Sequence, residues 1–517
     1  MNRHIIQTLV FIEERLVRAA NRKRRRPVPD APQPDQPEPV PKGNIVVGHE
    51  RDTPWKRCSR PAPAVSLTQE EIGSHLLYFA RTGAGKSVAI SHLAMQWMAS
   101  DRGLIVFDPD GSQSLHIIAL LTRYGNAEER LIFINLDEPD WIVGLDVLRG
   151  ADESSAMLLL DAIAKHWGAE FGPVVGRSIR AAVFTAALAK PNLTFGDILL
   201  LFSSRPLRNR AAKNADAASR RFWAEYGLMR PEQQRPYIEP VANRIESWLS
   251  ASTVGTMLSY PGGLNFRELF AKRPDAVVVV NLATRRAPSA SRLLAALLWS
   301  QIQSQLMHPD RTRPGTKPVL AICDEFQNLG SEESLMTTLA EARKYHLSLC
   351  LATQTFSRLS AAMRDTILGN CHAMFSFSSG DTSDFAKYVH FEGDPLPKSD
   401  IAAFLARQQT GQSVLIRPGV PSVAVQHLPP PREVTDGGPD AVRALIEASN
   451  RAWAVPREQA QREIAERQAR LTAEDTAASA VINDAVPTAH TPPAARRAAK
   501  RPLIVPETEN PDEKQTK

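Results

Sequence analysis

The residues with the clearest chemical potential lie between Ala80 and Ser87, in the run ARTGAGKS. This run fits the phosphate-loop pattern G-x-x-x-x-G-K-S/T, with Ala80 in place of the first glycine. Gly83 and Gly85 allow the backbone to curl so that its N–H groups face a phosphate, and a helix that starts here adds its dipole. The pattern predicts that a nucleotide is bound by Arg81, Thr82, Gly83, Ala84, Gly85, Lys86 and Ser87.

The sequence on both sides of this loop supports the prediction. The apolar run 76–79 is typical of a strand, and residues 88–98 are typical of an amphipathic helix. In this setting Lys86 would contact the β- and γ-phosphates of ATP, and Ser87 would ligate Mg²⁺. The alternative is a plain glycine turn with a surface lysine, which would need neither neighbour.

A second acidic motif follows the apolar run 318–323, which ends in Asp324 and Glu325. Carboxylates at the carboxyl end of a parallel strand lie where ligands bind in such sheets. We expect Asp324 to hold Mg²⁺ through water and Glu325 to orient or deprotonate the attacking water. The alternative is an Asp-Glu pair that only caps the next helix.

Two further polar residues belong to the same stretch of chain. Gln354 closes the run LSLCLAT (347–353), where an amide can sense the γ-phosphate or its water. Arg343 lies at the end of the preceding helix and could reach a neighbouring subunit's phosphate as an arginine finger. The alternatives are a surface-turn glutamine and a cation that interacts with the helix dipole.

The elements that must position these residues follow a βαβ pattern. Short, continuous, β-branched runs are each followed by a plausible helix, as in strands buried on both faces. This alternation predicts an α/β fold with a mainly parallel sheet and helices on both faces. The expected strands are 44–48, 76–79, 103–108, 131–135, 276–282, 318–324, 347–353 and 373–377.

The region from 151 to 269 interrupts this series with helical patterns. A crossover of this length is too long for a loop, so we expect an all-helical domain inserted between two parts of an ATPase domain, 43–150 and 270–435. Residues 1–42 read as a basic arm with a Pro-rich linker. Residues 436–517 read as a charged helical stretch followed by a disordered tail.

Charge and composition narrow the class of protein. Residues 1–66 carry 13 Lys/Arg and 7 Asp/Glu, which is the whole net charge of +6, so the rest of the chain is neutral. This argues against a small, uniformly basic nucleic-acid binder. No apolar run is long enough to cross a bilayer, and the 4 cysteines are too sparse for a disulfide scaffold. We expect a cytoplasmic protein, with peripheral attachment to a bacterial inner membrane as the alternative.

Taken together, these motifs resemble the HerA/FtsK superfamily of ring-forming DNA motor ATPases. Within it, the chain looks most like the conjugative coupling proteins of type IV secretion, of the TraD/TraG type. The resemblance covers residues 44–435 and rests on the stretches HLLYFARTGAGKS, LIVFDPDGS, VLAICDEFQNLG, LAEARKYHLSLCLATQTFSRL and ILGNCHAMFSFSSGDTSDFAKYV.

The resemblance implies a RecA-like P-loop ATP hydrolase that forms a hexameric ring, with ATP sites between subunits and DNA in a central channel. Its partners would be secretion or relaxosome components. Residue by residue, it implies Lys86 and Ser87 at the phosphates, Asp324 and Glu325 for Mg²⁺ and hydrolysis, Arg343 as finger and Gln354 as γ-phosphate sensor.

Besides Ala80 in place of the usual first glycine, the chain departs from the family in three ways. Ser378 stands where the family often has Arg, and Asp110 replaces a common Lys in the loop after the strand 103–108. Coupling proteins usually begin with membrane-spanning helices, and no such helix is expected here, so a partner subunit could supply the anchor or the basic arm could bind anionic lipid.

Three functions fit these observations. The first is an ATP-driven DNA translocase that recruits and pumps DNA to a conjugation apparatus. The second is a soluble HerA-like translocase in DNA processing or element defence. The third is a protein-export or assembly NTPase that binds no nucleic acid, which the zero net charge of residues 67–517 favours.

Overall fold

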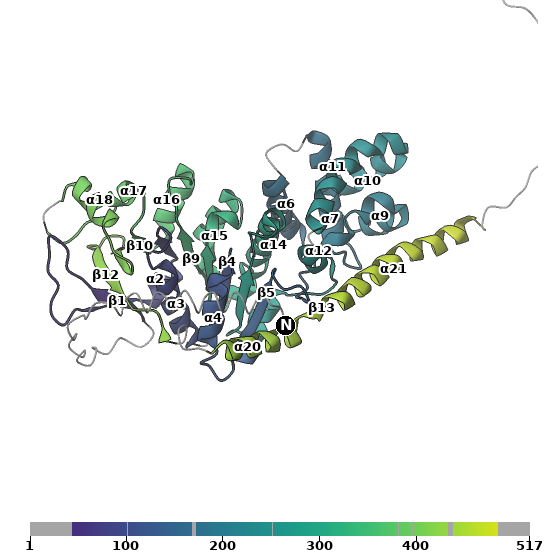
Figure 1. Ribbon diagram of the computed structural model, residues 1–517. Coiled ribbons are helices and arrows are strands. Elements are labelled where there is room, and N and C mark those ends of the chain that lie inside the picture. Colours follow the sequence, from purple (N-terminus) through teal and green to yellow (C-terminus); the bar gives the residue numbers. More distant parts are fainter. Residues whose placement is uncertain are drawn as a thin grey trace, which may run out of the picture. The chain divides into compact units, whose positions relative to one another are not determined.

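A computed structural model describes residues 44–483 apart from 101, 168–171, 251, 381, 394–395 and 433–437 (Figure 1). The predicted basic arm and the predicted disordered end of the tail lie outside the described residues. The described residues up to Thr472 form one compact unit. A second unit starts at Ala473, and its described part is the end of one helix.

The main sheet of the described chain has eleven strands in the order β2-β1-β12-β11-β10-β3-β9-β8-β4-β7-β5. The seven strands from β10 to β5 are parallel to one another. They are β3 (Leu76–Phe79), β4 (Gly103–Asp108), β5 (Leu131–Asn135), β7 (Val277–Asn281), β8 (Val319–Asp324), β9 (Leu347–Thr353) and β10 (Ala373–Phe377).

The other four strands extend the sheet in antiparallel fashion beyond β10. They are β1 (Ile45–Glu50), β2 (Ala64–Leu67), β11 (Gln412–Ile416) and β12 (Val423–His427). Only β1 is among the expected strands. The predicted fold class, an α/β fold with a mainly parallel sheet, is confirmed, while this antiparallel extension was not predicted. A two-stranded pair, β6 (Trp141–Ile142) and β13 (Val455–Pro456), stands apart from the main sheet.

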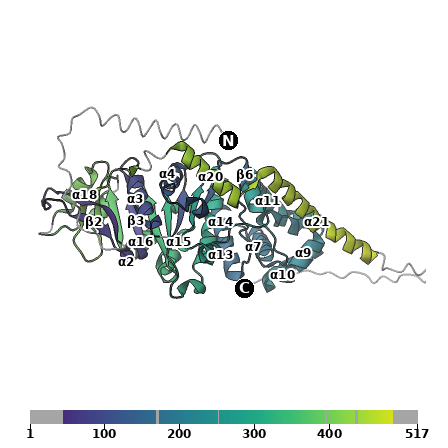
Figure 2. The same cartoon turned by 90° about the horizontal axis from the view of Figure 1, so that it is seen from below.

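Helices cover both faces of the parallel strands, so successive side chains of each strand are buried on both sides. Figure 2 shows α4 and α20 on one side and α15 and α16 on the other. The first face carries α3 (Lys86–Met98), α4 (Ser112–Leu121) and α20 (Pro439–Trp453). The second carries α14 (Pro288–Leu306), α15 (Glu332–Glu341) and α16 (Ala361–Asn370).

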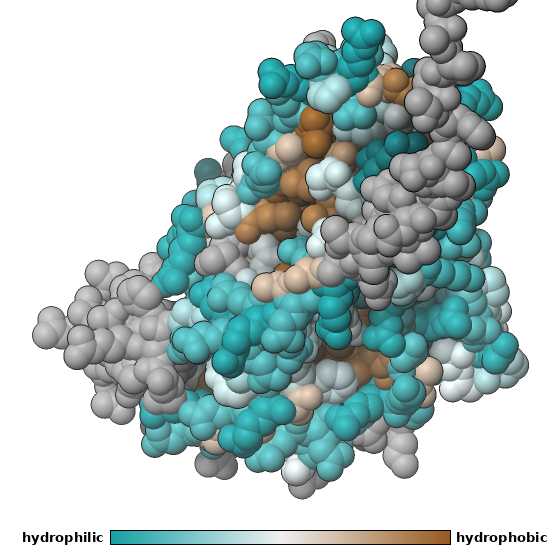
Figure 3. Space-filling view, turned by 90° about the vertical axis from the view of Figure 1, so that its right-hand side faces the viewer, coloured by the Kyte–Doolittle hydropathy of each residue, from teal (hydrophilic) through white to brown (hydrophobic). Residues whose placement is uncertain are grey.

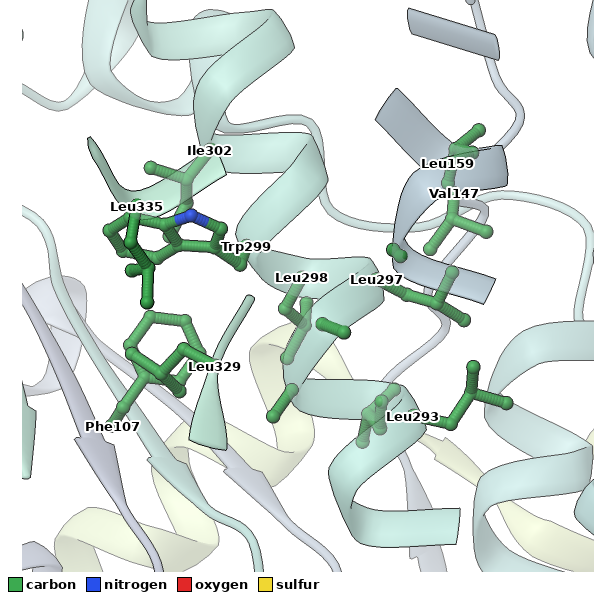
Figure 4. Close-up of a cluster of buried hydrophobic side chains, with 14 of the residues drawn as sticks. Phe107, Val147, Leu159, Leu293, Leu297, Leu298, Trp299, Ile302, Leu329 and Leu335 are labelled. Carbon is green, nitrogen blue, oxygen red and sulfur yellow. The ribbon is translucent and has the colours of Figure 1, made fainter. Parts of the chain in front are cut away.

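The second face has the larger apolar core. Phe107 of β4 meets Trp299 of α14 with ring centroids 6.4 Å apart, and Leu329 and Leu335 lie beside them (Figure 4). Closer to the amino end of α14, Leu297 faces Leu159 of α6, the first helix of the region between β6 and β7 (Figure 4). Large buried side chains of this kind supply most of the free energy that opposes chain entropy.

Between β6 and β7 the regular elements of the described residues are all helices. Phe222, Trp223 and Tyr226 of one helix form the aromatic centre of this region. Its first helix packs on α14 within the same compact unit, so the domain boundaries 151 and 269 stay a prediction. The helices are α6 (Glu153–Trp167), α7 (Pro173–Leu188), α8 (Leu200–Ser203), α9 (Arg205–Ala212), α10 (Ala217–Leu228), α11 (Pro231–Leu249), α12 (Ser252–Ser259) and α13 (Phe266–Lys272).

The remaining elements are short, except for the helix that follows β13. This helix, α21 (Arg457–Asn483), extends across the division between the two compact units. The other helices are α2 (Gln69–Gly73), α5 (Ala127–Arg130), α17 (Thr382–Ala386), α18 (Lys398–Ala406), and the 3-10 turns η1 (Phe195–Asp197), η2 (Pro309–Thr312), η3 (Phe326–Asn328) and η4 (Ala342–Tyr345). None of the described helices combines the length and apolar character needed to cross a bilayer.

Candidate nucleotide site

Three neighbouring parallel strands bring the predicted site residues to one edge of the sheet. β9 lies between β3 and β8, with Phe79 opposite Thr353 and Asp324 opposite Ala352. The phosphate loop follows β3, Asp324 ends β8, and Gln354 follows β9. Because parallel strands end at the same edge, residues that are far apart in sequence meet at this carboxyl edge.

The loop from Ala80 to Gly85 has the backbone that a phosphate cradle requires. Gly83 and Gly85 have φ angles of 80° and 105°, which side-chain-bearing residues rarely adopt. α3 starts at Lys86 directly after Gly85, and no described side chain caps it. The first N–H groups of the helix are therefore left for a ligand.

Two residues of the turn before β11 hydrogen-bond to the backbone of this loop. Gly411 N–H donates to the carbonyl of Ala84 at 2.8 Å, and the Thr410 hydroxyl donates to the carbonyl of Gly83 at 3.1 Å. A Cβ at Gly85 would lie 2.8 Å from the Gly411 nitrogen, so only glycine fits there. Sequence reasoning did not find this support, because only the T-G-Q turn before β11 hints at it.

The charged centre of the site joins Lys86 to both acidic residues. Lys86 Nζ donates to Asp324 Oδ1 and lies 3.9 Å from Glu325 Oε1. The side chains are 10%, 22% and 19% exposed, respectively, so their attraction is only partly screened by water. The lysine is thus placed beside the two carboxylates, where an incoming phosphate can compete for it.

A chain of side-chain hydrogen bonds ties Gln354 into the same centre. The Thr82 hydroxyl donates to Gln354 Oε1 at 2.8 Å, and Gln354 Nε2 donates to Glu325 Oε1 at 2.6 Å. Glu325 has a φ of 47°, in the left-handed region, which costs about 1–3 kcal/mol and is typical of functional sites. Gln354 therefore connects the phosphate loop to the predicted catalytic carboxylate.

The oxygen donors present suit Mg²⁺. Ser87 is exposed at the first turn of α3, and Asp324 is a partly exposed carboxylate at the end of β8. The described residues contain no group of three or more His, Cys, Asp or Glu side chains able to hold a metal. Mg²⁺ at phosphate sites uses one or two protein oxygens together with water and phosphate oxygens, so this donor set fits.

Arg343 is the predicted site residue that the fold does not bring to this edge. It lies in η4, before the amino end of β9, and it pairs with Glu70 at 3.4 Å. Seven residues of β9 separate it from Gln354, which is about 20 Å at 3.3 Å per residue. Arg343 therefore has no contact with the site of its own chain, and its action on a neighbour stays a prediction.

Two further polar residues, Asp108 and Gln327, lie at or just after the ends of strands at the same edge of the sheet. Asp108, at the end of β4, accepts from the N–H groups of Asp110 at 3.2 Å and Ser114 at 2.5 Å, so it fixes the start of α4. Burial raises the pKa of Asp108 to about 7. Gln327 Nε2 donates to Glu325 Oε2 at 2.7 Å. The sequence did not predict this contact, because Gln327 is one of several polar residues that follow Glu325.

The comparisons with known proteins agree with this fold and site. Residues 318–390, which include β8, Asp324, Glu325 and Gln354, match the family described as the TraM recognition site of TraD and TraG. A comparison with curated protein sequences found no match.

Solved structures give the same architecture at low identity. The plasmid coupling protein TrwB in complex with ADP and Mg²⁺ is 13% identical with a TM-score of 0.51, over 76% of this chain and 97% of that one. Unbound TrwBdeltaN70 is also 13% identical, with a TM-score of 0.51 over 75% and 96%. VirB4 of Thermoanaerobacter pseudethanolicus is 13% identical with a TM-score of 0.53, over 76% and 99%.

The parallel sheet and the loop that follows β3 together give the chain a RecA-like P-loop fold. The family match and the solved structures together confirm the resemblance to TraD/TraG-type coupling proteins that the motifs indicate.

Proposed function

We propose that the chain is an ATP hydrolase that drives DNA into a type IV secretion, or conjugation, apparatus. The observation that carries the proposal is one cluster of side chains, joined by hydrogen bonds and by the 3.9 Å ion pair of Lys86 with Glu325, and formed by Thr82, Lys86, Asp324, Glu325 and Gln354. This group combines a phosphate-binding cation, a metal-binding carboxylate, a water-orienting carboxylate and an amide sensor at one edge of a RecA-like sheet.

The residues have distinct roles in the proposed reaction. Lys86 leaves Asp324 and binds the β- and γ-phosphates, whose negative charge it stabilises. Glu325 orients the attacking water and accepts its proton at a carboxylate oxygen. Gln354, bonded to both Thr82 and Glu325, senses whether the γ-phosphate is present.

ATP with Mg²⁺ is the proposed ligand. Mg²⁺, when bound, supplies positive charge at the phosphates, with Ser87 and Asp324 as its protein oxygens. Solved structures of TrwB contain ADP with Mg²⁺ and a non-hydrolysable ATP analogue, which supports a nucleotide at the corresponding loop here.

The proposed assembly is a hexameric ring with DNA in its channel and Arg343 completing the site of the next subunit. The family match over 318–390 supports a relaxosome component as partner. An exposed apolar band on one face of the molecule supports contact with further macromolecules, because such bands mark interaction surfaces (Figure 3). A separate anchor subunit would place the ring at a membrane.

The test is ATP hydrolysis with no DNA, with single-stranded DNA and with double-stranded DNA. We expect DNA to stimulate hydrolysis, Lys86→Ala to abolish nucleotide binding and Glu325→Gln to bind ATP without hydrolysing it. Gln459→Ala is the matched control, since this exposed glutamine also donates to a glutamate, Glu463, at 2.8 Å.

Hydrolysis that is indifferent to both DNAs would retain the ATPase and reject the DNA motor, in favour of an export or assembly NTPase. A nuclease gene beside this one, in place of relaxase and secretion genes, would favour the HerA-like alternative.

A further inference from the structure

We propose that Gln327 positions the carboxylate of Glu325, and that Lys165 and Asp161 of α6 pass the state of that carboxylate to the helical region between β6 and β7. This inference rests on the proposed ATPase and adds a route by which its site is regulated. The route runs from Glu325 through Gln327 and the segment 327–331 to one face of α6.

Glu325 is held by two amides, one on each carboxylate oxygen. Gln354 Nε2 bonds Oε1 at 2.6 Å, and Gln327 Nε2 bonds Oε2 at 2.7 Å. Two donors on opposite oxygens fix the plane of the carboxylate, as a residue that aims at one water molecule requires. If Gln354 moves when the γ-phosphate binds, Gln327 is the second hydrogen-bond donor that then determines how the Glu325 carboxylate rotates.

Gln327 is poorly satisfied for a purely structural residue. Its Oε1 is buried and has no hydrogen-bond partner among the described residues, which costs free energy. A glutamine selected only for stability would have both ends of its amide paired. The unpaired oxygen is therefore consistent with a side chain that serves the carboxylate rather than the fold.

The backbone of the same segment is gripped by α6 at two points. Lys165 Nζ donates to the carbonyl of Gln327 at 3.3 Å, and the Ser331 hydroxyl donates to Asp161 Oδ2 at 2.7 Å. Asp161 and Lys165 are four residues apart and so lie on one face of the helix. Ser331 also caps α15, because its hydroxyl accepts from Ser334 N–H at 3.1 Å.

A cavity gives this segment room to move. It has a volume of about 620 Å³ beside Glu325, and its wall includes Lys165, Gln327, Glu332, Gln354 and Arg358. Packed protein interiors resist small shifts, but an element beside open space can take two positions. A rotation of the Glu325 carboxylate can thus move Gln327, and its carbonyl pulls on Lys165.

The first experiment measures kcat, KM and the Kd of a fluorescent ATP analogue for Gln327→Ala, Lys165→Met and Lys165→Arg. We expect kcat to fall about tenfold in Gln327→Ala and about threefold in Lys165→Met, with KM and Kd unchanged within about twofold. Lys165→Arg should restore kcat, because an arginine can donate to the same carbonyl.

The controls match each bond in kind. Gln459→Ala removes an amide that donates to a carboxylate, and Lys398→Met removes an ammonium that donates to the carbonyl of Lys387 at 3.3 Å. Both variants should hydrolyse ATP as the unaltered protein does.

The second experiment follows amide hydrogen exchange in α6 with ADP and with a non-hydrolysable ATP analogue. We expect the two nucleotides to give different protection of α6, and this difference should disappear in Gln327→Ala and Lys165→Met.

Any one of three results would overturn the proposal. They are a loss of nucleotide affinity as large as the loss of kcat in Gln327→Ala, a failure of Lys165→Arg to restore kcat, and an exchange difference in α6 that stays unchanged in both variants. If Gln327→Ala does not fold, the exposed Lys165 variants decide alone. Absence of hydrolysis in the unaltered protein would instead reject the proposed function, since the exchange experiment needs only nucleotide binding.

Discussion

The two edges of the parallel sheet bury and bond their polar residues in different ways. At the carboxyl edge, side chains bond to other side chains, as in the chain from Thr82 through Gln354 to Glu325. At the amino edge, two buried arginines bond to backbone carbonyls. Arg130 donates to the carbonyls of Asp275 and Met98, and Arg311 donates to those of Tyr345 and Lys317.

This difference separates a site from a scaffold. A side chain that bonds another side chain can exchange it for a ligand while the backbone stays in place. A guanidinium that bonds carbonyls from two segments ties those segments together, and its loss leaves buried acceptors unpaired. Changes at the amino edge should therefore alter stability, and changes at the carboxyl edge should alter nucleotide chemistry.

Arg130→Ala should give the largest effect. Arg130 is 2% exposed and ties α5 to the residues before β7 and to the last residue of α3. Removing it leaves two carbonyls and the Asp275 carboxylate without this partner, so we expect a loss of about 3 kcal/mol in the free energy of unfolding. Urea unfolding measures it. Arg177→Ala, which breaks an exposed pair with Glu225, should cost less than about 1 kcal/mol. Equal losses would contradict the comparison.

Gly85→Ala tests the carboxyl edge. The φ of 105° and the close Gly411 nitrogen oppose any Cβ, so the loop must move away from its phosphate-binding shape. We expect nucleotide affinity to fall about 100-fold, which is about 2.7 kcal/mol. Gly315→Ala is the control, because Gly315 has a φ of 85° and open space around it, and it precedes β8 at the amino edge. A similar loss of affinity in both variants would break the distinction.

His75 makes the amino edge sensitive to pH. Its Nε2 lies 3.1 Å from the Leu339 carbonyl, and its Nδ1 accepts from Leu349 N–H at 3.0 Å, so the ring is neutral with its proton on Nε2. Burial lowers the pKa of His75 to about 4. The unfolded chain therefore binds more protons between the ordinary pKa of about 6.5 and 4, and stability falls as pH falls through that window.

The size of the pH effect follows from these two pKa values. Between pH 7 and pH 5 it amounts to about 2 kcal/mol. Urea unfolding of His75→Gln at both pH values should show a smaller loss on acidification than the unaltered protein by this amount. Identical pH dependence would mean that the ring does not titrate as inferred.

Gln354→Ala should give the smallest effect. It removes one support of Glu325 while Gln327 keeps the other, so we expect kcat to fall about tenfold with little change in stability. Steady-state hydrolysis and urea unfolding measured together test both halves of this statement. A loss of stability without a change in kcat would place Gln354 with the scaffold.

The continuous apolar runs predicted β3, β4, β5, β9 and β10 to the residue, because strands buried on both faces leave a strong signal. The strand order of the fold then brings Lys86, Asp324, Glu325 and Gln354 together, as the motifs indicated; their catalytic roles stay predictions. The antiparallel strands β11 and β12, QSVLI and VAVQH, were missed because polar residues at one end shorten their apolar runs and no helix lies between them, so they fall outside the βαβ pattern.

Contacts over long sequence separations explain the rest. Gly85 meets Gly411, and Gln327 meets Lys165, although nothing local to either residue names its partner. Arg343 lies at the end of a helical segment, as predicted. However, β9 runs from this end of the sheet to the other, so Arg343 lies at the opposite edge of the sheet from Gln354.

If Lys86 binds phosphate and Asp324 binds a divalent cation, as we propose, their pairing makes the two binding events depend on each other. A phosphate that draws Lys86 away leaves a half-buried carboxylate without its counter-charge, and a divalent cation at Asp324 removes that penalty. By thermodynamic linkage, the factor by which the cation raises nucleotide affinity equals the factor by which the nucleotide raises cation affinity. Neither ligand alone should then bind well, so the resting protein would discriminate between free nucleotide and its metal complex before any catalysis begins.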